Sequence, residues 1–556
     1  MQRLEAYHFY EHEWDSYDEL LEAFEWEVPE RFNMATYVCD RWAGERGRVA
    51  LFAEDAAGET ETYTFWQLRN HANALANFLA DRGVEAGDRV GINAPQRAET
   101  AIAHIACWKL GAVSVPLSTL FGTDALAYRL DDASAVACIV DESNVETFRA
   151  VADDLDALET RVTVGEVDPR GAEVDFWDAI DGSARRFETA DTAAEDDAIV
   201  IYTSGTTGDP KGVRHAHRVL LGNLPLFLTT FCNLKLSESD VFWTPSEWAW
   251  VATLFDVLFP GLFYGRPVVT YHGDGKFDPE TAMRVIETYG VTNFFAPPTA
   301  LRMMMQLDDP DRWDASSVRC VPSGGESLGQ SIVDWAEDVF EGAAVHEGYG
   351  QTEANMLAGD CTALTGFREG TIGRRGPGHE IAILDPETAE RVDEPGEVGE
   401  IAVRYAGNPV CFKEYWGKPE ETAQKVRDGW LLTEDLGTLD ADGYLSFVGR
   451  TDTVIISAGY RIGPVEIEEA LAAHPAVADA GVVGVPDDER GEIPKAFVVL
   501  AAGYEPGDEL RAEFRQHVRD RLAEYEYPRE IEFIDELPTT TSGKVRRAAL
   551  EERSDR

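Results

Sequence analysis

The segment YTSGTTGDPKG, from Tyr202 to Gly212, follows the apolar run AIVIYT at Ala198 to Thr203. It combines three glycines, several hydroxyl side chains and one lysine. Glycines let backbone N–H groups turn toward an anion, and hydroxyls and lysine add donors and positive charge. The spacing G-x-x-x-x-G-K-[ST] of a Walker A loop is absent. A strand leading into this loop predicts a phosphate site in an α/β fold, whereas an ordinary Gly/Ser/Thr turn does not account for the whole string.

Short apolar segments alternate with longer amphipathic ones around this loop. The strand-like Val90 to Ile92 precedes a helical run at Glu99 to Leu110, and AVSVPL at Ala112 to Leu117 follows. This rhythm predicts parallel sheets covered by helices. Further strand candidates with the same apolar character are residues 137–142, 267–271 and 293–298. The opening segment, Tyr7 to Trp42, is predicted to be helical with a break at Pro29.

The pattern changes after about Thr371, where glycine-rich β segments occupy residues 380–385, 396–404 and 443–450. A second α/β unit begins near Thr451. The predicted fold class is therefore α/β. We expect residues 1–450 to form a large N-terminal region of two α/β subdomains and a β-rich subdomain, and residues 451–556 to form a small C-terminal α/β domain. With no low-complexity linker, we expect a tight hinge between them.

The charge balance of the 556-residue chain is strongly acidic, with 102 Asp and Glu against 49 Lys and Arg and a formal net charge of -53. Such a surface repels nucleic acid and anionic membranes, which excludes both as expected partners. Only nine of the cations are lysines. Scarce lysine with abundant carboxylates suggests a protein from a high-salt cytoplasm, where self-repulsion is screened; an acidic mesophilic enzyme is the alternative.

Seven separated cysteines form no CxxC pair, and they resemble neither a zinc ligand set nor a disulfide framework. The N-terminus has no leader pattern, and no apolar stretch is long enough to span a bilayer. We therefore expect a cytoplasmic protein. The sequence leaves the oligomeric state open between a monomer and a homodimer.

The whole eleven-residue string resembles the phosphate-binding loop of the adenylate-forming superfamily, which includes acyl-CoA synthetases, non-ribosomal adenylation domains and luciferases. Further motifs of that family follow in the same order and cover nearly all of the chain. They are SGGES at 323–327, EGYGQTE at 347–353, TEDLG at 433–437, GRTD at 449–452, SAGYRIGPVEIE at 457–468 and TTTSGKVRR at 539–547.

The resemblance implies a nucleotide site for ATP. In this resemblance the loop would bind the phosphates, and the SGGES and EGYGQTE segments would bind adenine and the α-phosphate. Asp435 and Arg450 would bind the ribose, and Arg461 would contact a phosphate. Each cation or carboxylate could instead be a solvated surface charge, and Asp435 could cap a turn. The residues expected to bind nucleotide are Thr203, Ser204, Gly205, Thr206, Thr207, Lys211, Gly325, Glu326, Ser327, Glu347, Gly348, Tyr349, Gly350, Gln351, Thr352, Asp435, Arg450, Arg461 and Lys544.

The resemblance also implies the chemistry. A carboxylate is a poor electrophile, so the acid must first become a mixed anhydride with AMP, which requires positioning and charge neutralisation. The catalytic residues would be Lys544, bridging the carboxylate and the α-phosphate, Thr352, donating to the α-phosphate, and Glu353, holding Mg²⁺.

Coenzyme A is the expected second substrate. The small domain would rotate about the hinge residue Asp452, and Ala458 and Gly459 would then line the pantetheine tunnel. Arg519 has the spacing of an arginine near the CoA nucleotide in related synthetases, although a surface arginine would look the same.

The acyl pocket is expected to involve Trp250 and Val251 within the aromatic stretch from Ser246 to Gly265, most of which should be core. Acetyl-specific relatives carry a tryptophan where this chain has Gly350, so the glycine predicts room for methylenes, each worth about 0.8 kcal/mol when buried. The segment from Pro29 to Ala43 resembles the medium-chain acyl-CoA synthetase branch. We therefore expect a medium-chain, branched or aromatic acid.

Two departures from the family pattern bear on these sites. Glu434 stands where relatives usually have glycine, which adds a carboxylate near the nucleotide. Trp248 and Ala249 replace smaller residues, so they could narrow the pocket wall. The alternatives are an acetyl- or propionyl-CoA synthetase, a stand-alone enzyme that loads a carrier protein, a nucleotide-binding regulator without chemistry, and a luciferase-like oxygenase.

Overall fold

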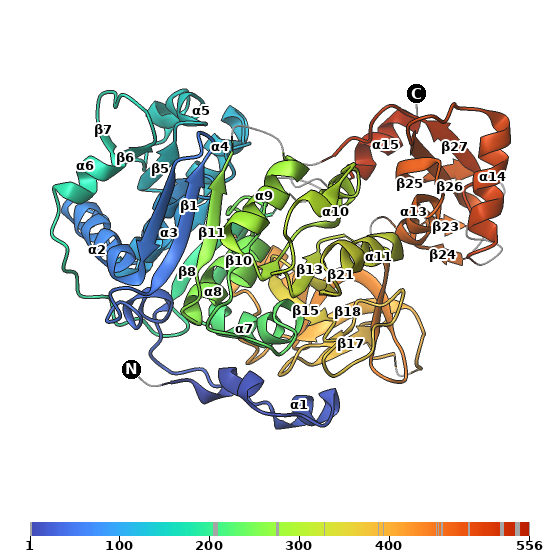
Figure 1. The fold of residues 1–556 in the computed structure, drawn as a ribbon, viewed down its shortest axis with the longest axis horizontal. Coiled ribbons are helices and arrows are strands. Elements are labelled where there is room, and N and C mark those ends of the chain that lie inside the picture. Colours follow the sequence, from blue (N-terminus) through green and yellow to red (C-terminus); the bar gives the residue numbers. More distant parts are fainter. Residues whose placement is uncertain are drawn as a thin grey trace.

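The computed structural model describes residues 3–203, 210–273, 277–326, 328–386, 388–392, 394–451, 453, 455–457, 460–487, 490–522, 527–539 and 545–554. Three sheets build the N-terminal region, and a fourth lies in the C-terminal unit at one end of the molecule (Figure 1). This arrangement confirms the predicted α/β class.

The first sheet has eight strands in the order β19-β9-β8-β4-β3-β5-β6-β7. From β8 to β7 all neighbours pair in parallel, whereas β9 and β19 pair antiparallel at one edge. Its strands are β3 (Arg89–Asn93), β4 (Val113–Pro116), β5 (Ala137–Asp141), β6 (Thr160–Val164), β7 (Glu173–Asp175), β8 (Asp197–Tyr202), β9 (Gly212–Ala216) and β19 (Glu414–Tyr415). The strands predicted at 90–92, 112–117, 137–142 and 198–203 are confirmed.

Helices between these strands cover the sheet, as the βα alternation requires. The predicted helix at 99–110 is confirmed as α3 (Ala98–Leu110), whose thirteen residues are buried except for the last. It ends because Gly111 adopts the left-handed conformation at φ 81°. The other helices here are α2 (Phe65–Asp81), α4 (Thr123–Asp132), α5 (Val145–Arg149), η3 (Ala152–Asp154) and α6 (Phe176–Asp181).

The second sheet has nine strands in the order β16-β15-β14-β13-β12-β10-β11-β1-β2, and it is parallel from β14 to β1. Its strands are β1 (Val49–Asp55), β2 (Thr60–Thr64), β10 (Phe242–Trp243), β11 (Val268–His272), β12 (Asn293–Phe294), β13 (Cys320–Gly324), β14 (Ala344–Gln351), β15 (Ala354–Gly359) and β16 (Arg374–Arg375). The strand predicted at 267–271 is confirmed, and the one predicted at 293–298 is shorter than expected, because helix α10 already begins at Pro298.

The helices associated with this sheet include α9 (Pro279–Tyr289), which Asp278 caps by accepting a hydrogen bond from the Thr281 N–H and which Gly290 ends. The others are α7 (Val219–Leu226), η4 (Phe227–Phe231), η5 (Thr253–Leu258), α8 (Phe259–Phe263), α10 (Pro298–Met304), η6 (Pro310–Arg312) and α11 (Gln330–Val339). The aromatic stretch from Ser246 to Gly265, expected to be mostly core, thus contains a π-helical turn, η5, continued by α8, and every residue of both is buried.

The β-rich part is an antiparallel sheet in the order β17-β18-β21-β20, with β22 beside β21. Its elements are β17 (Ile381–Leu384), β18 (Gly399–Arg404), α12 (Pro419–Lys425), β20 (Val426–Arg427), β21 (Trp430–Leu439) and β22 (Leu445–Arg450). Three of these strands match the predicted segments at 380–385, 396–404 and 443–450.

The C-terminal unit has its own sheet and core. Its sheet runs β24-β23-β26-β25, with β27 beside β26, and Ile467, Val482 and Phe514 are among its buried side chains. The elements are β23 (Ile455–Ser457), β24 (Tyr460–Ile462), α13 (Pro464–Ala472), β25 (Val477–Asp487), β26 (Gly491–Leu500), α14 (Asp508–Arg519), β27 (Glu530–Phe533) and α15 (Arg547–Ser554).

The opening segment differs from the prediction of a helix. It forms short turns: η1 (Glu5–Glu11), α1 (Tyr17–Ala23) and the π-helical η2 (Thr36–Asp40), joined by extended chain. Long-range contacts outweigh local propensity, because the Tyr17 hydroxyl donates to the Arg375 carbonyl at 3.1 Å and the Trp26 indole donates to the Gly378 carbonyl at 3.0 Å.

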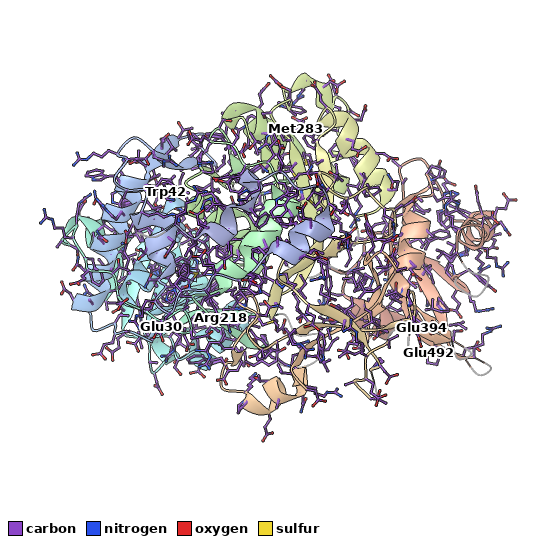
Figure 2. The ribbon with its side chains drawn as sticks, turned by 90° about the horizontal axis from the view of Figure 1, so that it is seen from below. Glu30, Trp42, Arg218, Met283, Glu394 and Glu492 are labelled. Atoms are coloured by element: carbon purple, nitrogen blue, oxygen red, sulfur yellow. The ribbon has the colours of Figure 1, made fainter. Side chains whose placement is uncertain are left out.

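Acidic side chains are spread over the surface, as the composition predicts. Figure 2 places two of them, the exposed Glu30 and Glu394, in well-separated parts of the molecule. Within the described parts of the chain, no helix is both long and apolar enough to cross a membrane.

Candidate active site

A single large cleft, with a volume of about 3770 Å³, collects most of the predicted site residues. Its walls include the carboxyl ends of β8, β11, β13 and β14, the edge where ligands of parallel α/β sheets bind. Residues of α13 and α15, among them Glu469 and Arg547, complete the lining from the C-terminal unit. The cleft therefore lies between the N-terminal region and the C-terminal unit.

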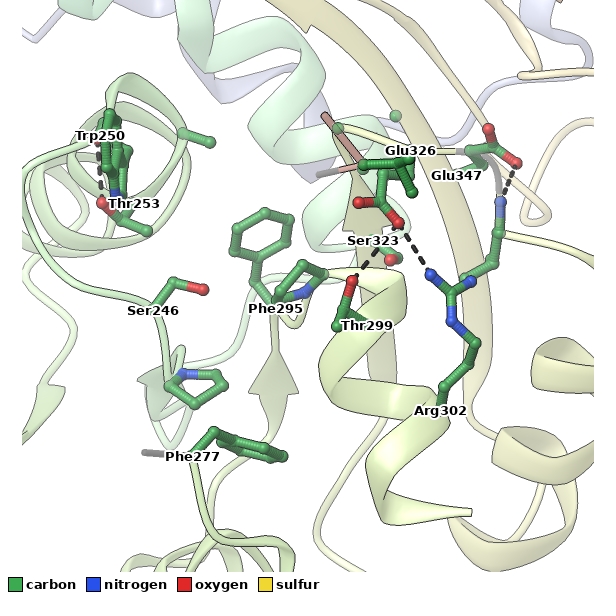
Figure 3. A pocket seen from close by; sticks show the side chains of 18 of the residues that line it. Ser246, Trp250, Thr253, Phe277, Phe295, Thr299, Arg302, Ser323, Glu326 and Glu347 are labelled. Carbon is green, nitrogen blue, oxygen red and sulfur yellow. Dashed lines mark hydrogen bonds and ion pairs between the residues drawn. The ribbon is translucent and has the colours of Figure 1, made fainter. Parts of the chain in front are cut away.

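The SGGES segment begins with the last two residues of β13, Ser323 and Gly324, and continues along the cleft (Figure 3). Gly325 has φ 91°, a left-handed conformation that favours glycine. Glu326 accepts hydrogen bonds from the Arg302 guanidinium at 2.9 Å and the Thr299 hydroxyl at 3.4 Å, so helix α10 fixes this turn. Ser327 lies outside the described residues.

Strand β14 carries the EGYGQTE segment along the same wall. Glu347 accepts a hydrogen bond from the Leu328 N–H at 3.3 Å. A Cβ at Gly348 would lie 2.5 Å from the Met356 Cε, so a side chain there would require the flexible methionine to move. These two residues and Gly325 all line the cleft, which places the two predicted adenine segments side by side.

Tyr349 connects the adenine wall with the predicted ribose residues. Its hydroxyl donates to the Asp435 carboxylate at 2.7 Å, and burial raises the pKa of the tyrosine, with the Asp435 charge adding to the rise. Asp435 on β21 pairs in register with Arg450 on β22, whose Nη1 lies 3.4 Å from the Asp435 Oδ1. All three residues line the cleft.

Gly350 lines the cleft with its main chain at a break in the β14–β15 register. A Cβ there would lie 2.5 Å from the Met356 nitrogen and 2.8 Å from the Asn355 carbonyl carbon. The close approach of β15 therefore requires glycine here on backbone grounds. This is a second reason for the glycine, independent of the length of the acyl chain.

Gln351 and Thr352 are held by main-chain contacts. The Gln351 amide donates to the Thr433 carbonyl at 3.1 Å, and the His215 Nε2 lies 2.7 Å from the Thr352 carbonyl oxygen. Burial lowers the pKa of His215 to about 4, so its ring is neutral at pH 7 and Nε2 donates. The hydroxyl-bearing turn is thus fixed at the cleft wall.

Glu353 is buried, with 8% of its surface exposed, yet it lines the cleft. Its Oε1 accepts a hydrogen bond from the Tyr415 hydroxyl at 2.5 Å. The Lys211 ammonium lies 5.0 Å from the centre of the Tyr415 ring and pairs with Glu421 at 2.9 Å. A carboxylate at this position offers the hard oxygen ligand that Mg²⁺ prefers, so the donor chemistry fits the ion implied by the resemblance.

The phosphate-binding loop is described at its two ends. The Thr203 N–H donates to the Lys211 carbonyl at 3.0 Å, and both residues line the cleft. The predicted residues between them, Ser204, Gly205, Thr206 and Thr207, fall in the part of the chain that is not described.

The predicted acyl-pocket residues Trp250 and Val251 both line the cleft, close to Thr253, whose hydroxyl donates to the Trp250 carbonyl at 2.9 Å (Figure 3). Trp248 and Ala249 are 1% and 4% exposed and are absent from the cleft lining. The prediction that they narrow the pocket wall is not supported, because the indole of Trp248 packs into the core instead.

The C-terminal candidates are described only in part. Arg461 lies on β24, where its backbone pairs with Ile456 of β23. Arg519 is exposed at the end of α14, its guanidinium lies 3.8 Å from the centre of the Tyr527 ring, and it is not among the cleft-lining residues. Four predicted residues, Asp452, Ala458, Gly459 and Lys544, lie outside the described ranges.

Several residues that contact the site escaped prediction. Tyr415, His215 and Lys425 reach it from β19, β9 and α12, and Asp256 and Asn355 reach it from η5 and β15. Asn355 could have been suspected, because it follows the EGYGQTE segment by two positions. The others carry no local signal, since they are brought in by tertiary folding.

Family models give the same assignment as the motifs. The model described as AMP-binding enzyme matches residues 39–416, and the model described as AMP-binding enzyme C-terminal domain matches residues 466–544. The first match alone covers more than half of the chain.

Full-length relatives and solved structures agree with these models. The chain is 35% identical to an uncharacterized acyl-CoA ligase, YtcI, of Bacillus subtilis, covering 95% of this chain and 97% of the relative. It is 34% identical to the human mitochondrial acyl-coenzyme A synthetase ACSM4 (94% and 90% covered) and to the acetyl-coenzyme A synthetase of B. subtilis (97% and 95%).

Among solved structures, the anthranilate CoA ligase AuaEII in complex with anthranoyl-AMP matches with a TM-score of 0.87 at 29% identity, covering 95% of this chain and 98% of that one. An acyl-CoA synthetase of Brucella canis matches with a TM-score of 0.74 at 32% identity, covering 98% and 99%. The chain belongs to the AMP-binding enzyme family, among the acyl-CoA synthetases of the adenylate-forming superfamily.

Proposed function

We propose that this acyl-CoA synthetase acts on a medium-chain, branched or aromatic carboxylic acid rather than on acetate. The observation that carries the proposal is the apolar part of the cleft wall, where the large side chains of Phe231, Trp250 and Phe295 are arranged with Val251 and Met356. A two-carbon acid would leave most of this surface without contacts, whereas each buried methylene of a longer acid contributes about 0.8 kcal/mol.

The class of reaction follows from the family. The enzyme is an AMP-forming ligase that joins the acid to the α-phosphate of ATP, releases pyrophosphate and transfers the acyl group from AMP to CoA. ATP and CoA are its substrates, and Mg²⁺ is the family's metal.

The geometry supports specific nucleotide roles. Asp435, with Arg450 beside it and Tyr349 bonded to its carboxylate, presents acceptors and donors suited to ribose hydroxyls. The Gly325 turn and the Tyr349 ring provide two surfaces between which adenine would stack. Lys211 and the Thr203 end of the loop would hold the phosphates, and Lys211 must then exchange its contact with Glu421 for phosphate oxygens.

The first half-reaction would depend on charge neutralisation. Lys544 would lie between the substrate carboxylate and the α-phosphate and offset the charge that builds up in the transition state. Thr352 would donate to the α-phosphate from the turn that His215 fixes. Glu353 would hold Mg²⁺, which supplies charge compensation for the phosphates when bound.

The second half-reaction would use the two-part construction. We place the boundary between residues 1–450 and 451–556, because β22 ends at Arg450 and the next sheet begins at Ile455 with a separate core. Asp452 would be the hinge, and Ala458 and Gly459 would line the CoA tunnel. The role of Arg519 near the CoA nucleotide rests on its spacing, since the side chain lies away from the cleft.

We also place the enzyme in the cytoplasm. All seven cysteines are free and buried, which suits a reducing compartment. The acidic surface would keep it away from nucleic acids and anionic lipids.

The test is pyrophosphate release in molar KCl with ATP, Mg²⁺ and CoA, across straight-chain acids from acetate to dodecanoate and benzoate. We expect a maximum at an intermediate length or with the aromatic acid, formation of the matching acyl-CoA, and loss of activity in Lys544→Ala. A maximum at acetate would contradict the substrate proposal and leave the reaction class intact. Pyrophosphate release without acyl-CoA would indicate loading of a carrier protein.

A further inference from the structure

A buried polar pair interrupts the apolar part of the cleft wall. Asp256 on η5 and Asn355 on β15 are 1% and 3% exposed, and both line the cleft. The Asn355 amide donates to the Asp256 Oδ1 at 2.6 Å and to the Asn223 Oδ1 at 2.9 Å. This network fixes the orientation of the Asp256 carboxyl group.

The second carboxyl oxygen, Oδ2, is buried and has no hydrogen-bond partner among the described residues. The described ion pairs include none with Asp256. Burial raises the pKa of this carboxyl well above its usual range, and the Asn355 hydrogen bond lowers it only in part. Burial therefore favours the neutral form of this acid. Because Oδ1 accepts from Asn355, a proton on this carboxyl belongs on Oδ2, which then offers an O–H donor and an acceptor lone pair.

The apolar side chains around Asp256 cannot hydrogen-bond to its Oδ2. A buried polar group that has lost its water and gained no partner destabilises the structure. Two further side chains that line the same cleft, Gln96 and Ser323, also hold a buried polar atom that lacks a partner in the described structure, namely Oε1 and Oγ. Unsatisfied polar atoms of this kind suit a ligand that carries a polar group into an otherwise apolar pocket.

We propose that Asp256 is a specificity-determining residue that hydrogen-bonds an uncharged polar substituent, a hydroxyl or an aromatic amine, on the acyl group of the substrate. This rests on the proposed function, because it assigns the acyl group to this part of the cleft. It narrows the substrate class to acids with a hydrogen-bonding group far from the carboxylate. An ammonium group fits less well, because Asp256 is 1% exposed in an apolar wall, where a charged group would lose its hydration.

The buried Oδ2 of Asp256 should make the enzyme prefer an acid with a hydroxyl group over the same acid with a methyl group. An acid with a methyl group in place of the hydroxyl leaves Oδ2 without a partner in the complex, whereas the hydroxyl satisfies both groups. Sites built around a substrate hydroxyl reject analogues without it more strongly than an apolar pocket rejects an extra methylene. A penalty of about 1.4 kcal/mol already corresponds to a tenfold preference.

The experiment compares acids in pairs that exchange a hydroxyl for a methyl group of similar size: 3-hydroxybenzoate with 3-methylbenzoate, 4-hydroxybenzoate with 4-methylbenzoate, and 6-hydroxyhexanoate with heptanoate. Acyl-CoA formation gives kcat/KM for each. We expect at least one pair to favour the hydroxyl acid by about tenfold. Asp256→Leu should reverse that preference, and Asp256→Asn should keep it, because an amide also has a donor and an acceptor. The aminobenzoates then separate the amine from the hydroxyl.

Leu254→Met is the matched control, because Leu254 is buried on the same π-helical turn but is absent from the cleft lining. It should keep the wild-type preference. A preference for the methyl acid in every pair, or a hydroxyl preference that survives in Asp256→Leu, would overturn the inference. If no acid gives pyrophosphate, the proposed function fails; calorimetric binding of the same pairs with ATP present, to wild type and Asp256→Leu, then decides the inference by the same criterion.

Discussion

The side chains of Glu434 and Arg450 form an ion pair at the mouth of the nucleotide site, with the Glu434 Oε2 3.2 Å from the Arg450 Nη2. The same carboxylate oxygen lies 3.2 Å from the ammonium of the buried Lys425. Glu434 directly precedes Asp435 on β21, and its backbone has φ 62°, in the left-handed region. Relatives with glycine at this position avoid that conformational cost, so this chain accepts backbone strain and gains an anchor for two cations.

Two substitutions of Glu434 distinguish the effect of its strained backbone conformation from the effect of its negative charge. Glu434→Gln keeps the unfavourable conformation and removes the charge, whereas Glu434→Gly removes both. A side chain in the left-handed region costs about 1–2 kcal/mol, of which glycine recovers part after its own entropy loss. We expect Glu434→Gly to be more stable than Glu434→Gln by about 1 kcal/mol in urea unfolding, and both variants to bind ATP more weakly because Arg450 loses one of its carboxylate partners. A glycine variant less stable than the glutamine variant would contradict the strain argument.

The hydrogen bond from Tyr415 to Glu353 predicts an effect on magnesium. The Tyr415 hydroxyl orients the proposed metal ligand at 2.5 Å, and removing such outer partners typically costs 10–100-fold in metal affinity. Tyr415→Phe should therefore require about tenfold more Mg²⁺ for calorimetric binding of ATP, with little change at saturating Mg²⁺. Tyr405→Phe is the matched control, since that hydroxyl donates to the Lys413 carbonyl outside the cleft. Equal magnesium dependence of the two variants would exclude the positioning role.

Much of this architecture follows from local sequence. The strands β3, β4, β5, β8 and β11 were predicted within one or two residues because each is a short buried run of apolar side chains between turn signals. The helical prediction for the opening segment was wrong because its structure depends on distant contacts. Its aromatic side chains hydrogen-bond to residues more than three hundred positions away in the sequence, and no local pattern records such contacts.

Some residues of the site could likewise be predicted from local sequence, and others could not. Residues within motifs, such as Tyr349, Asp435 and Arg450, are brought together in the cleft as the motifs imply. Asp256 could not be found from the sequence, because an acidic residue in an apolar helix gives no sign of whether its carboxyl faces solvent, core or ligand. The steric reason for Gly350 also needed the structure, since it depends on the approach of β15.

The net charge of -53 predicts a salt-dependent fold. Self-repulsion destabilises a compact chain, and the Debye length falls from about 10 Å at 0.1 M salt to about 3 Å at 1 M. We expect the free energy of unfolding to rise by a few kcal/mol between 0.1 and 2 M KCl, and NaCl to act equally, because screening depends on ionic strength. Urea titrations at each salt concentration measure this. Stability that stays constant or falls with salt would contradict the high-salt interpretation of the composition.

A buried histidine outside the site predicts sensitivity to acid. His104 on α3 is fully buried between Trp108 and Phe259, at ring distances of 5.8 Å and 5.6 Å, and neither of its nitrogens has a partner in the described structure. Burial lowers the pKa of His104 to about 3 from 6.5. Between these values the unfolded chain binds a proton that the folded chain does not, so stability is fully present above pH 6.5 and is lost as the pH falls toward 3.

His104→Leu removes this proton linkage while keeping an apolar side chain in the helix. The loss attributable to His104 is about 1.4 kcal/mol per pH unit within that window. The unfolding free energy of His104→Leu, measured in urea at pH 7, 6 and 5, should therefore fall with acid less steeply than that of wild type by about this amount. Ile105→Val, a buried change on the same helix without a titrating group, should lower stability equally at each pH, by about 1 kcal/mol. If His104→Leu keeps the wild-type slope, His104 is already solvated or protonated in the folded protein, and the acid sensitivity comes from other titrating groups.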